Sequence, residues 1–419
     1  MDRDSLIEIM QVILRNPIRT LLASIGVAWG IMMLILMVGA GNGLENGVKQ
    51  EMEGAAQNSI FLWTQSTSMP YKGFSQGRSF ELNNSDVDFL RANVPQVGVI
   101  APRNQLNGWR GANNISRGTK TGAFNVYGDY PEFQLVEPVT ITSGRFLNHG
   151  DISDYRKVCV VGPAAAEELF EKGEEVLGEY IAVNGVNFRV VGIFKSAKVG
   201  EDAEEDNRTI YVPFTTFQRA FHTGDDVGWL SLLSAENYTV KETEEAVMIA
   251  LRARKSVHPD DKRAFGSWNL QERMEEMDTI FGAFDIVGFF MGFLVLLAGI
   301  IGIVNIMLIT VKERTKEFGI RRSLGARPLQ VIFQVMKETL LLTTLAGLVG
   351  MMMGIGLLEL VNLIIGDAGS TGSFKNPGVD LQLVITALIV MIVSGAVAGL
   401  LPALRAVAIR PVDALRSDG

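Results

Sequence analysis

Four long stretches without a charged residue constrain this chain more than any other feature. They cover residues 21–41, 286–311, 339–358 and 381–404, and are 21, 26, 20 and 24 residues long. An α-helix needs about 20 apolar residues to cross the hydrocarbon core of a bilayer, so each stretch is long enough to be a membrane span. The alternative is a set of buried helices in a large soluble core. Four such stretches in one acidic chain disfavour it.

The expected fold class is a membrane protein with four transmembrane α-helices and a large mixed α/β extracytoplasmic domain between the first and second. We place the spans at residues 21–41, 285–311, 331–358 and 381–404. The remaining segments are an interfacial helix at 1–20, the extracytoplasmic domain at 42–284, a cytoplasmic loop at 312–328, an external loop at 359–380 and a tail at 405–419. The first segment is predicted to lie on the membrane surface because Leu6, Ile9 and Ile13 share one helical face.

Basic residues in the short loops predict the orientation. The loop at 312–328 is the most basic, with Lys312, Arg314, Lys316, Arg321, Arg322 and Arg327. The loop at 359–380 has only Lys375. Because lysine and arginine concentrate in cytoplasmic loops, both termini and the loop at 312–328 should be cytoplasmic. Residues 42–284, with 24 basic and 34 acidic side chains, should then lie outside the cytoplasm.

Composition excludes several classes of function. One cysteine, Cys159, permits no intrachain disulfide and no cysteine cluster, and the three histidines lack metal-ligand spacing, so no metal site is expected. A net charge of −8 disfavours nucleic acid as a partner. The sequence contains no G-x-x-x-x-G-K-[ST] phosphate loop and no G-x-S-x-G or H-E-x-x-H motif, so no catalytic residue is predicted.

Within the extracytoplasmic domain, turn and cap signals predict individual elements. Strands are expected at 58–64 and 157–161, helices at 84–93 and 240–254, and a hairpin turning at Asn184-Gly185. Residues 201–206 should be an acidic loop, and 69–78 and 105–120 mobile loops. Cys159 should be a small core residue. One sub-domain is expected to be inserted within another.

Each predicted span contains one G-x-x-x-G motif. This spacing places two glycines on one helix face and allows two backbones to approach closely, so it favours a tightly packed, oligomeric bundle over a wide pore. The eight residues are Gly26, Gly30, Gly288, Gly292, Gly350, Gly354, Gly395 and Gly399. Glycine is common in membrane helices, so a single motif would carry little weight.

The cytoplasmic loop resembles that of the FtsX-like, MacB-type family of ABC permeases. The resemblance rests on Gly302-Ile-Val-Asn-Ile-Met-Leu308, on Lys312-Glu-Arg-Thr-Lys-Glu-Phe-Gly-Ile-Arg-Arg-Ser-Leu-Gly-Ala326 and on Arg410-Pro-Val-Asp-Ala-Leu-Arg416. It implies that a helix in this loop docks into an ATPase. The residues to which it assigns this role are Glu313, Arg314, Glu317, Phe318, Gly319, Ile320, Arg321, Arg322, Leu324 and Gly325. We expect the three arginines to be exposed, and the apolar side formed by Phe318, Ile320 and Leu324 to be buried against the partner.

The same resemblance implies a function for the whole chain. Such a permease works as a dimer, of two copies or with a paralogue, and passes ATP-driven conformational change across the membrane to drive export from the periplasm. The name-giving relative carries its ATPase on the same polypeptide. Here ATP and Mg²⁺ would be bound by a separate ABC ATPase subunit, and a periplasmic adaptor and outer-membrane channel are further possible partners. Two alternatives remain open: a lipoprotein-extracting permease, and a signalling permease that regulates an external hydrolase.

Overall fold

The computed structural model describes residues 17–52, 54–108, 113–198, 201–367, 377–379 and 381–408. The chain divides into two compact units. We call residues 1–47 and 279–419 the helical unit, and residues 48–278 the α/β unit. The predicted interfacial helix at 1–20 and the tail at 405–419 lie mostly outside the described residues.

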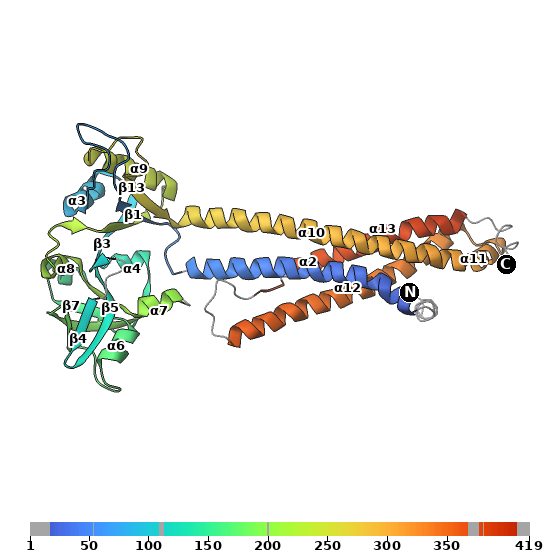
Figure 1. The fold of residues 1–419 in the computed structure, drawn as a ribbon, viewed down its shortest axis with the longest axis horizontal. Coiled ribbons are helices and arrows are strands. Elements are labelled where there is room, and N and C mark those ends of the chain that lie inside the picture. Colours follow the sequence, from blue (N-terminus) through green and yellow to red (C-terminus); the bar gives the residue numbers. More distant parts are fainter. Residues whose placement is uncertain are drawn as a thin grey trace. The chain divides into compact units, whose positions relative to one another are not determined.

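Long helices form the helical unit (Figure 1). They are α2 (Pro17–Met52), α10 (Leu270–Glu313), α12 (Pro328–Asp367) and α13 (Leu381–Ala408), with the short α11 (Thr315–Ser323) between α10 and α12. Four helices in the described part of the chain are long and apolar enough to cross a membrane. Together with the mixed α/β unit between the first and second of them, they confirm the predicted fold class.

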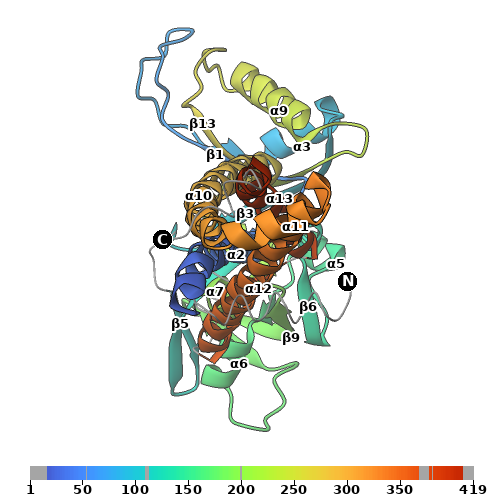
Figure 2. The same ribbon diagram turned by 90° about the vertical axis from the view of Figure 1, so that its right-hand side faces the viewer.

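One apolar core holds the helical unit together. Its buried side chains come from α2, α10, α11, α12 and α13, among them Ile31, Ile303, Phe318, Val335 and Met391. Figure 2 looks along the helices from the end at which α11 lies. Many leucines, isoleucines and phenylalanines on the other faces of these helices are exposed, as expected for surfaces that contact lipid.

Among the described residues, the α/β unit contains thirteen strands, the seven helices that lie between α2 and α10, and the first turns of α10. The strands are β1 (Ser59–Thr64), β2 (Leu82–Asn83), β3 (Val97–Gln105), β4 (Asn113–Arg117), β5 (Lys120–Asp129), β6 (Val139–Gly144), β7 (Val158–Val161), β8 (Tyr180–Val183), β9 (Val186–Ser196), β10 (Thr209–Pro213), β11 (Asp226–Val227), β12 (Trp229–Ser234) and β13 (Phe265–Asn269). The helices are α3 (Asn84–Asn93), α4 (Phe133–Val136), α5 (His149–Ser153), α6 (Pro163–Leu169), α7 (Glu201–Asn207), α8 (Phe214–Ala220) and α9 (Val240–Arg254), and the α10 segment that begins at Leu270.

Six of these strands close into a barrel. They pair in the cyclic order β5–β4–β8–β9–β7–β10, and a parallel ladder between β10 and β5 completes the ring. Each of the six strands pairs with a neighbour on both of its edges. Closure thus protects the sheet from pairing with other chains. Alternate residues such as Cys159 and Val161 point into one core, whereas Val158 and Val160 belong to another. We call residues 105–213 the barrel lobe.

The rest of the α/β unit forms a second lobe around β3, β12, β1 and β13, which pair in that order. Its core contains Ile60, Leu90, Phe214, Leu232 and Leu251, and includes side chains of α3, α8 and α9. We call it the sheet lobe. Because its residues come from both sides of 105–213 in the sequence, the barrel lobe is inserted within the sheet lobe, as the sequence predicts.

Most local predictions for the α/β unit are confirmed, and two are wrong. The hairpin turns at Asn184 and Gly185, both with positive φ, and Cys159 is fully buried. The predicted acidic loop at 201–206 is instead helix α7, in which Asp206 accepts a hydrogen bond from Ser196. The predicted mobile loop at 105–120 contains β4, because its alternating Asn113 and Ile115 fit the barrel wall.

Candidate functional site

The candidate site is the turn of the chain between the second and third long helices. α10 ends at Glu313, Arg314 breaks the helix with φ −96° and ψ 14°, and α11 begins at Thr315. α11 ends where Gly325 adopts a φ of +95°, a conformation that favours glycine. Pro328 then begins α12, a position at which proline costs no hydrogen bond.

Arg314 joins this turn to the helix that follows. Its Nη1 donates hydrogen bonds of 2.8 and 3.0 Å to the two carboxylate oxygens of Glu338, which is buried in α12. Its Nε and Nη2 donate to the carboxylate of Glu317 at 2.7 and 2.9 Å. Burial opposes the charge of Arg314, but these carboxylates outweigh it and raise its pKa, so Arg314 stays protonated. The hydrogen bond from Arg314 lowers the pKa of Glu317.

Two further arginines tie α11 to its neighbours. Nη1 of Arg321 donates to the side chain of Gln334 in α12 at 2.7 Å. Nη1 of Arg322 donates to the backbone carbonyl of Val407 in α13. α11 is therefore held by side chains to both of the helices that follow it, and a displacement of α11 must move them or break these bonds.

The structure corrects two expectations about exposure. Phe318, predicted to be buried against a partner, is 1% exposed within this chain and belongs to the core of the helical unit. Arg314, predicted to be exposed, is mostly buried against Glu338. The physical reason is that α11 lays its own apolar side on the ends of the long helices. Gly319, also predicted for the partner contact, is buried as well.

Ile320 and Leu324, predicted to share one apolar face with Phe318, instead lie on an exposed side of α11. Lys316, Ile320 and Leu324 follow one another at intervals of four residues, so they line one side of the helix. Ile320 is 42% exposed and Leu324 is 83% exposed. The predicted residues thus separate into an anchoring set that faces the long helices and an apolar pair, Ile320 and Leu324, with a cation beside it.

The predicted glycines pack against helices of the same chain. A Cβ on Gly26 would lie 2.9 Å from the Cα of Gly299, and one on Gly350 would lie 2.1 Å from the carbonyl oxygen of Ala28. Similar contacts within 3.4 Å exist for the glycines at 30, 292, 354, 395 and 399, whereas Gly288 has only Met37 at 3.5 Å. The motif search missed Gly299. Its signal was a spacing of seven from Gly292, which places both on one helix face.

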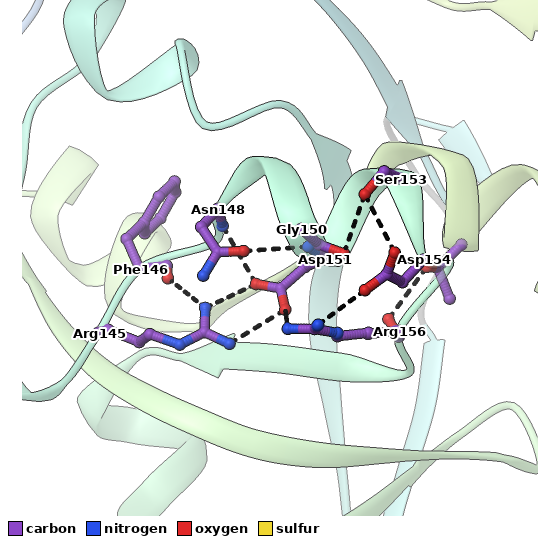
Figure 3. Close-up of polar contacts among 9 residues, drawn as sticks. Arg145, Phe146, Asn148, Gly150, Asp151, Ser153, Asp154 and Arg156 are labelled. Carbon is purple, nitrogen blue, oxygen red and sulfur yellow. Dashed lines mark hydrogen bonds and ion pairs between the residues drawn. The ribbon is translucent and has the colours of Figure 1, made fainter.

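Two features of the structure were not predicted from the sequence. One is the contact between Glu338 and the loop, and the other is a polar cluster in the α/β unit. There Asp151 is fully buried at its side chain and accepts two hydrogen bonds from Arg145, at 2.6 and 3.0 Å (Figure 3). Arg156 lies 3.6 Å from the same carboxylate. Neither feature has a motif, because the partners meet only through tertiary packing or through a local turn.

Comparison with known proteins identifies relatives of both parts of the chain. Residues 20–261 match the MacB-like periplasmic core domain family, and residues 289–411 match the FtsX-like permease C-terminal family. The chain is 29% identical to the ABC transporter permease YvrN of Bacillus subtilis (strain 168), over 97% of this chain and 98% of that protein.

Other relatives are longer than this chain. It is 25% identical to the macrolide export ATP-binding/permease protein MacB of Bdellovibrio bacteriovorus, over 97% of this chain and 61% of that protein. It is 26% identical to the pyoverdine export ATP-binding/permease protein PvdT of Pseudomonas entomophila, over 96% of this chain and 58% of that protein. Among solved structures, the periplasmic region of MacB from Actinobacillus actinomycetemcomitans matches with a TM-score of 0.43 and 18% identity, over 55% of this chain and 96% of that one.

Proposed function

The chain belongs to the MacB-like, FtsX-like family of ABC transporter permeases, and on this premise we propose that it is the permease subunit that carries ATP-driven conformational change across the membrane to drive export from the periplasm. The printed names of two relatives, a macrolide exporter and a pyoverdine exporter, support export over other uses of the fold. The substrate of this chain is left open by those names.

The observation that carries the proposal is the anchoring of α11. A helix that transmits force must expose one face to the motor and be fixed on the other to the helices that it moves. Ile320 and Leu324 supply the exposed face. Arg314, Arg321 and Arg322 supply the fixed side, through Glu338, Gln334 and the carbonyl of Val407. A push on α11 would then be felt by α12 and α13 together.

The proposal places the remaining parts as follows. An ABC ATPase, which the permease family implies, binds ATP and Mg²⁺, since residues 1–419 contain no phosphate loop. A second permease copy or a paralogue completes a dimer. The protein lies in the bacterial inner membrane with both termini and α11 in the cytoplasm, and the α/β unit outside it is available to a periplasmic adaptor and an outer-membrane channel.

Reconstitution tests this function. The chain would be purified alone, and together with a candidate ABC ATPase from the same organism, and both preparations would be placed in nanodiscs. We expect no ATP turnover from the chain alone, and turnover by the complex that depends on an intact α11. ATP hydrolysis by a preparation free of other subunits, or a chain that never assembles with an ABC ATPase, would contradict the proposal.

A further inference from the structure

The chain crosses between the two lobes of the α/β unit at two places, within β3 and at the end of β10. β3 pairs with β12 of the sheet lobe as far as Arg103, and with β5 of the barrel lobe from Asn104 onward. β10 runs beside β5 as far as Pro213, which is opposite Asp129. The next residue, Phe214, already lies in the core of the sheet lobe. A motion of one lobe against the other would bend the chain at these two crossings.

A buried ion pair lies at the crossings. Arg103 Nε is 3.0 Å from Asp129 Oδ1, and the two residues are 7% and 0% exposed. Among the described residues, neither carboxylate oxygen of Asp129 has a hydrogen bond of good geometry, and neither does Arg103 Nε. The pair is therefore held by charge at close range. Such a pair adds little net stability, because removing both charges from water offsets their attraction.

Four aromatic rings surround the guanidinium of Arg103. Its guanidinium carbon lies 3.9 Å from the ring centroids of both Tyr127 and Phe133. The rings of Trp229 and Tyr211 are 5.6 and 5.7 Å away. Trp229 belongs to the sheet lobe, and the other three rings belong to the barrel lobe. Contacts of this kind stabilise a cation over a ring face and depend on its orientation.

The segment that follows α2 is connected to this cluster. The backbone N–H of Ala56 donates to the carbonyl of Val136 at 2.7 Å. Val136 ends α4, the same short helix whose Phe133 stacks on Arg103. A displacement of the segment after α2 would therefore reach the cluster through one hydrogen bond and one turn of helix.

We propose that Arg103 and Asp129 form a latch that fixes the angle between the barrel lobe and the sheet lobe, and that its release lets the two lobes move. This inference is independent of the proposed export function, because it concerns only contacts within the α/β unit. Burying this ion pair costs about as much free energy as the attraction between its charges supplies. A contribution to stability therefore does not explain why the pair is present. Its place at both crossings explains it as a device that selects one arrangement of the lobes.

Distances between the lobes test the latch in the full-length chain. Spin labels would be placed at Lys172→Cys in the barrel lobe and Glu245→Cys in the sheet lobe, both exposed positions. The native Cys159 is fully buried, so we expect it to take up little label. Distance distributions would be recorded by pulsed electron paramagnetic resonance for the doubly labelled chain without further substitutions. The same measurement would be made with Arg103→Met, Arg103→Lys or Asp129→Asn added. The control is Arg117→Met, which removes a guanidinium bound to Glu174 and Glu179 wholly within the barrel lobe.

We expect one narrow distance for the unmodified lobes and for Arg117→Met, and a shifted or second distance for Arg103→Met and Asp129→Asn. Arg103→Lys keeps the charge but loses the planar group between the rings, so its distribution should be broadened. If Arg103→Met fails to fold, the distance distributions of Arg103→Lys and Asp129→Asn still test the latch. An unchanged distribution in folded Asp129→Asn, or an equal change in Arg117→Met, would overturn the latch.

Discussion

Arg314 and Glu338 lie 24 positions apart, and two hydrogen bonds of 2.8 and 3.0 Å join the guanidinium of one to the carboxylate of the other. The contact bridges the break between α10 and α12, and it buries a charge pair at the end of an apolar helical core. Because Glu317 binds the same guanidinium, α11 and α12 share one cation. Several expected outcomes depend on this arrangement and on the packing around it.

The exposed face of α11 should decide assembly with the ATPase. We expect Leu324→Asp and Ile320→Asp to weaken co-purification with the ATPase and to reduce ATP turnover, because docking would bury an unpaired carboxylate at a cost of several kcal/mol, on the order of a hundredfold or more in affinity. The matched control is Ile249→Asp, the same change at an exposed position of α9. Full assembly by Leu324→Asp would show that this face is not the docking face.

Phe318→Asp should instead damage the permease itself. Phe318 is buried in the core of the helical unit, so a carboxylate there would lack a partner and cost several kcal/mol of stability before any ATPase binds. We expect a lower melting temperature for the purified chain alone. A normal melt combined with lost assembly would restore the original expectation that Phe318 contacts the partner.

Glu338→Gln should destabilise the end of the helical unit. Removing one partner of a buried ion pair leaves the other charge uncompensated, which costs about 3–5 kcal/mol of stability. The loss should be smaller here because Glu317 still binds the guanidinium of Arg314. Thermal melting in detergent measures the effect, and Lys337→Gln at the exposed neighbouring position should leave the melting temperature unchanged. Equal melting temperatures for the two variants would mean that the pair does not contribute.

Two glycines of the helical unit should respond in opposite ways to alanine. In Gly26→Ala the new Cβ would lie 2.9 Å from Gly299 Cα, which forces α2 away from α10 and should cost about 1–3 kcal/mol. Gly302 has no atom within 4 Å of such a Cβ, so Gly302→Ala should be neutral or stabilise by up to about 1 kcal/mol. Thermal melting in detergent compares the two variants. A shift of the melting temperature in the same direction for both would contradict the packing argument.

The stability of the α/β unit should fall in acid through Asp151. Burial alone would raise its pKa, but hydrogen bonds from Arg145 and the Asn148 backbone outweigh burial and lower it. Because the pKa of Asp151 is lower in the folded chain, its carboxylate stabilises the fold at pH values above the unfolded pKa of about 4. This stabilisation is lost as the pH falls through the folded pKa. Tryptophan fluorescence reports this unit, which contains four of the five tryptophans. Asp151→Asn should flatten the acid limb, and Asp154→Asn, a more exposed partner of Arg156, should not.

Labelling of intact cells should establish the orientation. A cysteine at Asn107 should react with a membrane-impermeant maleimide, and one at Lys316 should react only after lysis, because the basic loop is placed in the cytoplasm. The native Cys159 is buried and gives little background. Reaction of Lys316→Cys in intact cells would reverse the proposed topology.

The fold class could be predicted from the sequence because the strongest signals in this chain are local. Twenty uncharged apolar residues in a row can be satisfied only by a helix in lipid or in a deep core, whatever the rest of the chain does. The Asn184-Gly185 turn and the 240–254 helix follow from the same kind of signal, since positive φ and a Thr239–Glu242 capping box are set within four residues.

The tertiary structure alone decided which face of each element is buried. The 312–326 motif places Phe318 on α11, but only packing against the long helices buries it and leaves Ile320 and Leu324 exposed. Likewise, Arg103 and Asp129 meet because β3 pairs antiparallel with β5 and β10 closes the barrel beside them. Glu338 was missed for the same reason. A side chain's partner from a distant segment is fixed by the register of two elements, and no pattern within either element records that register.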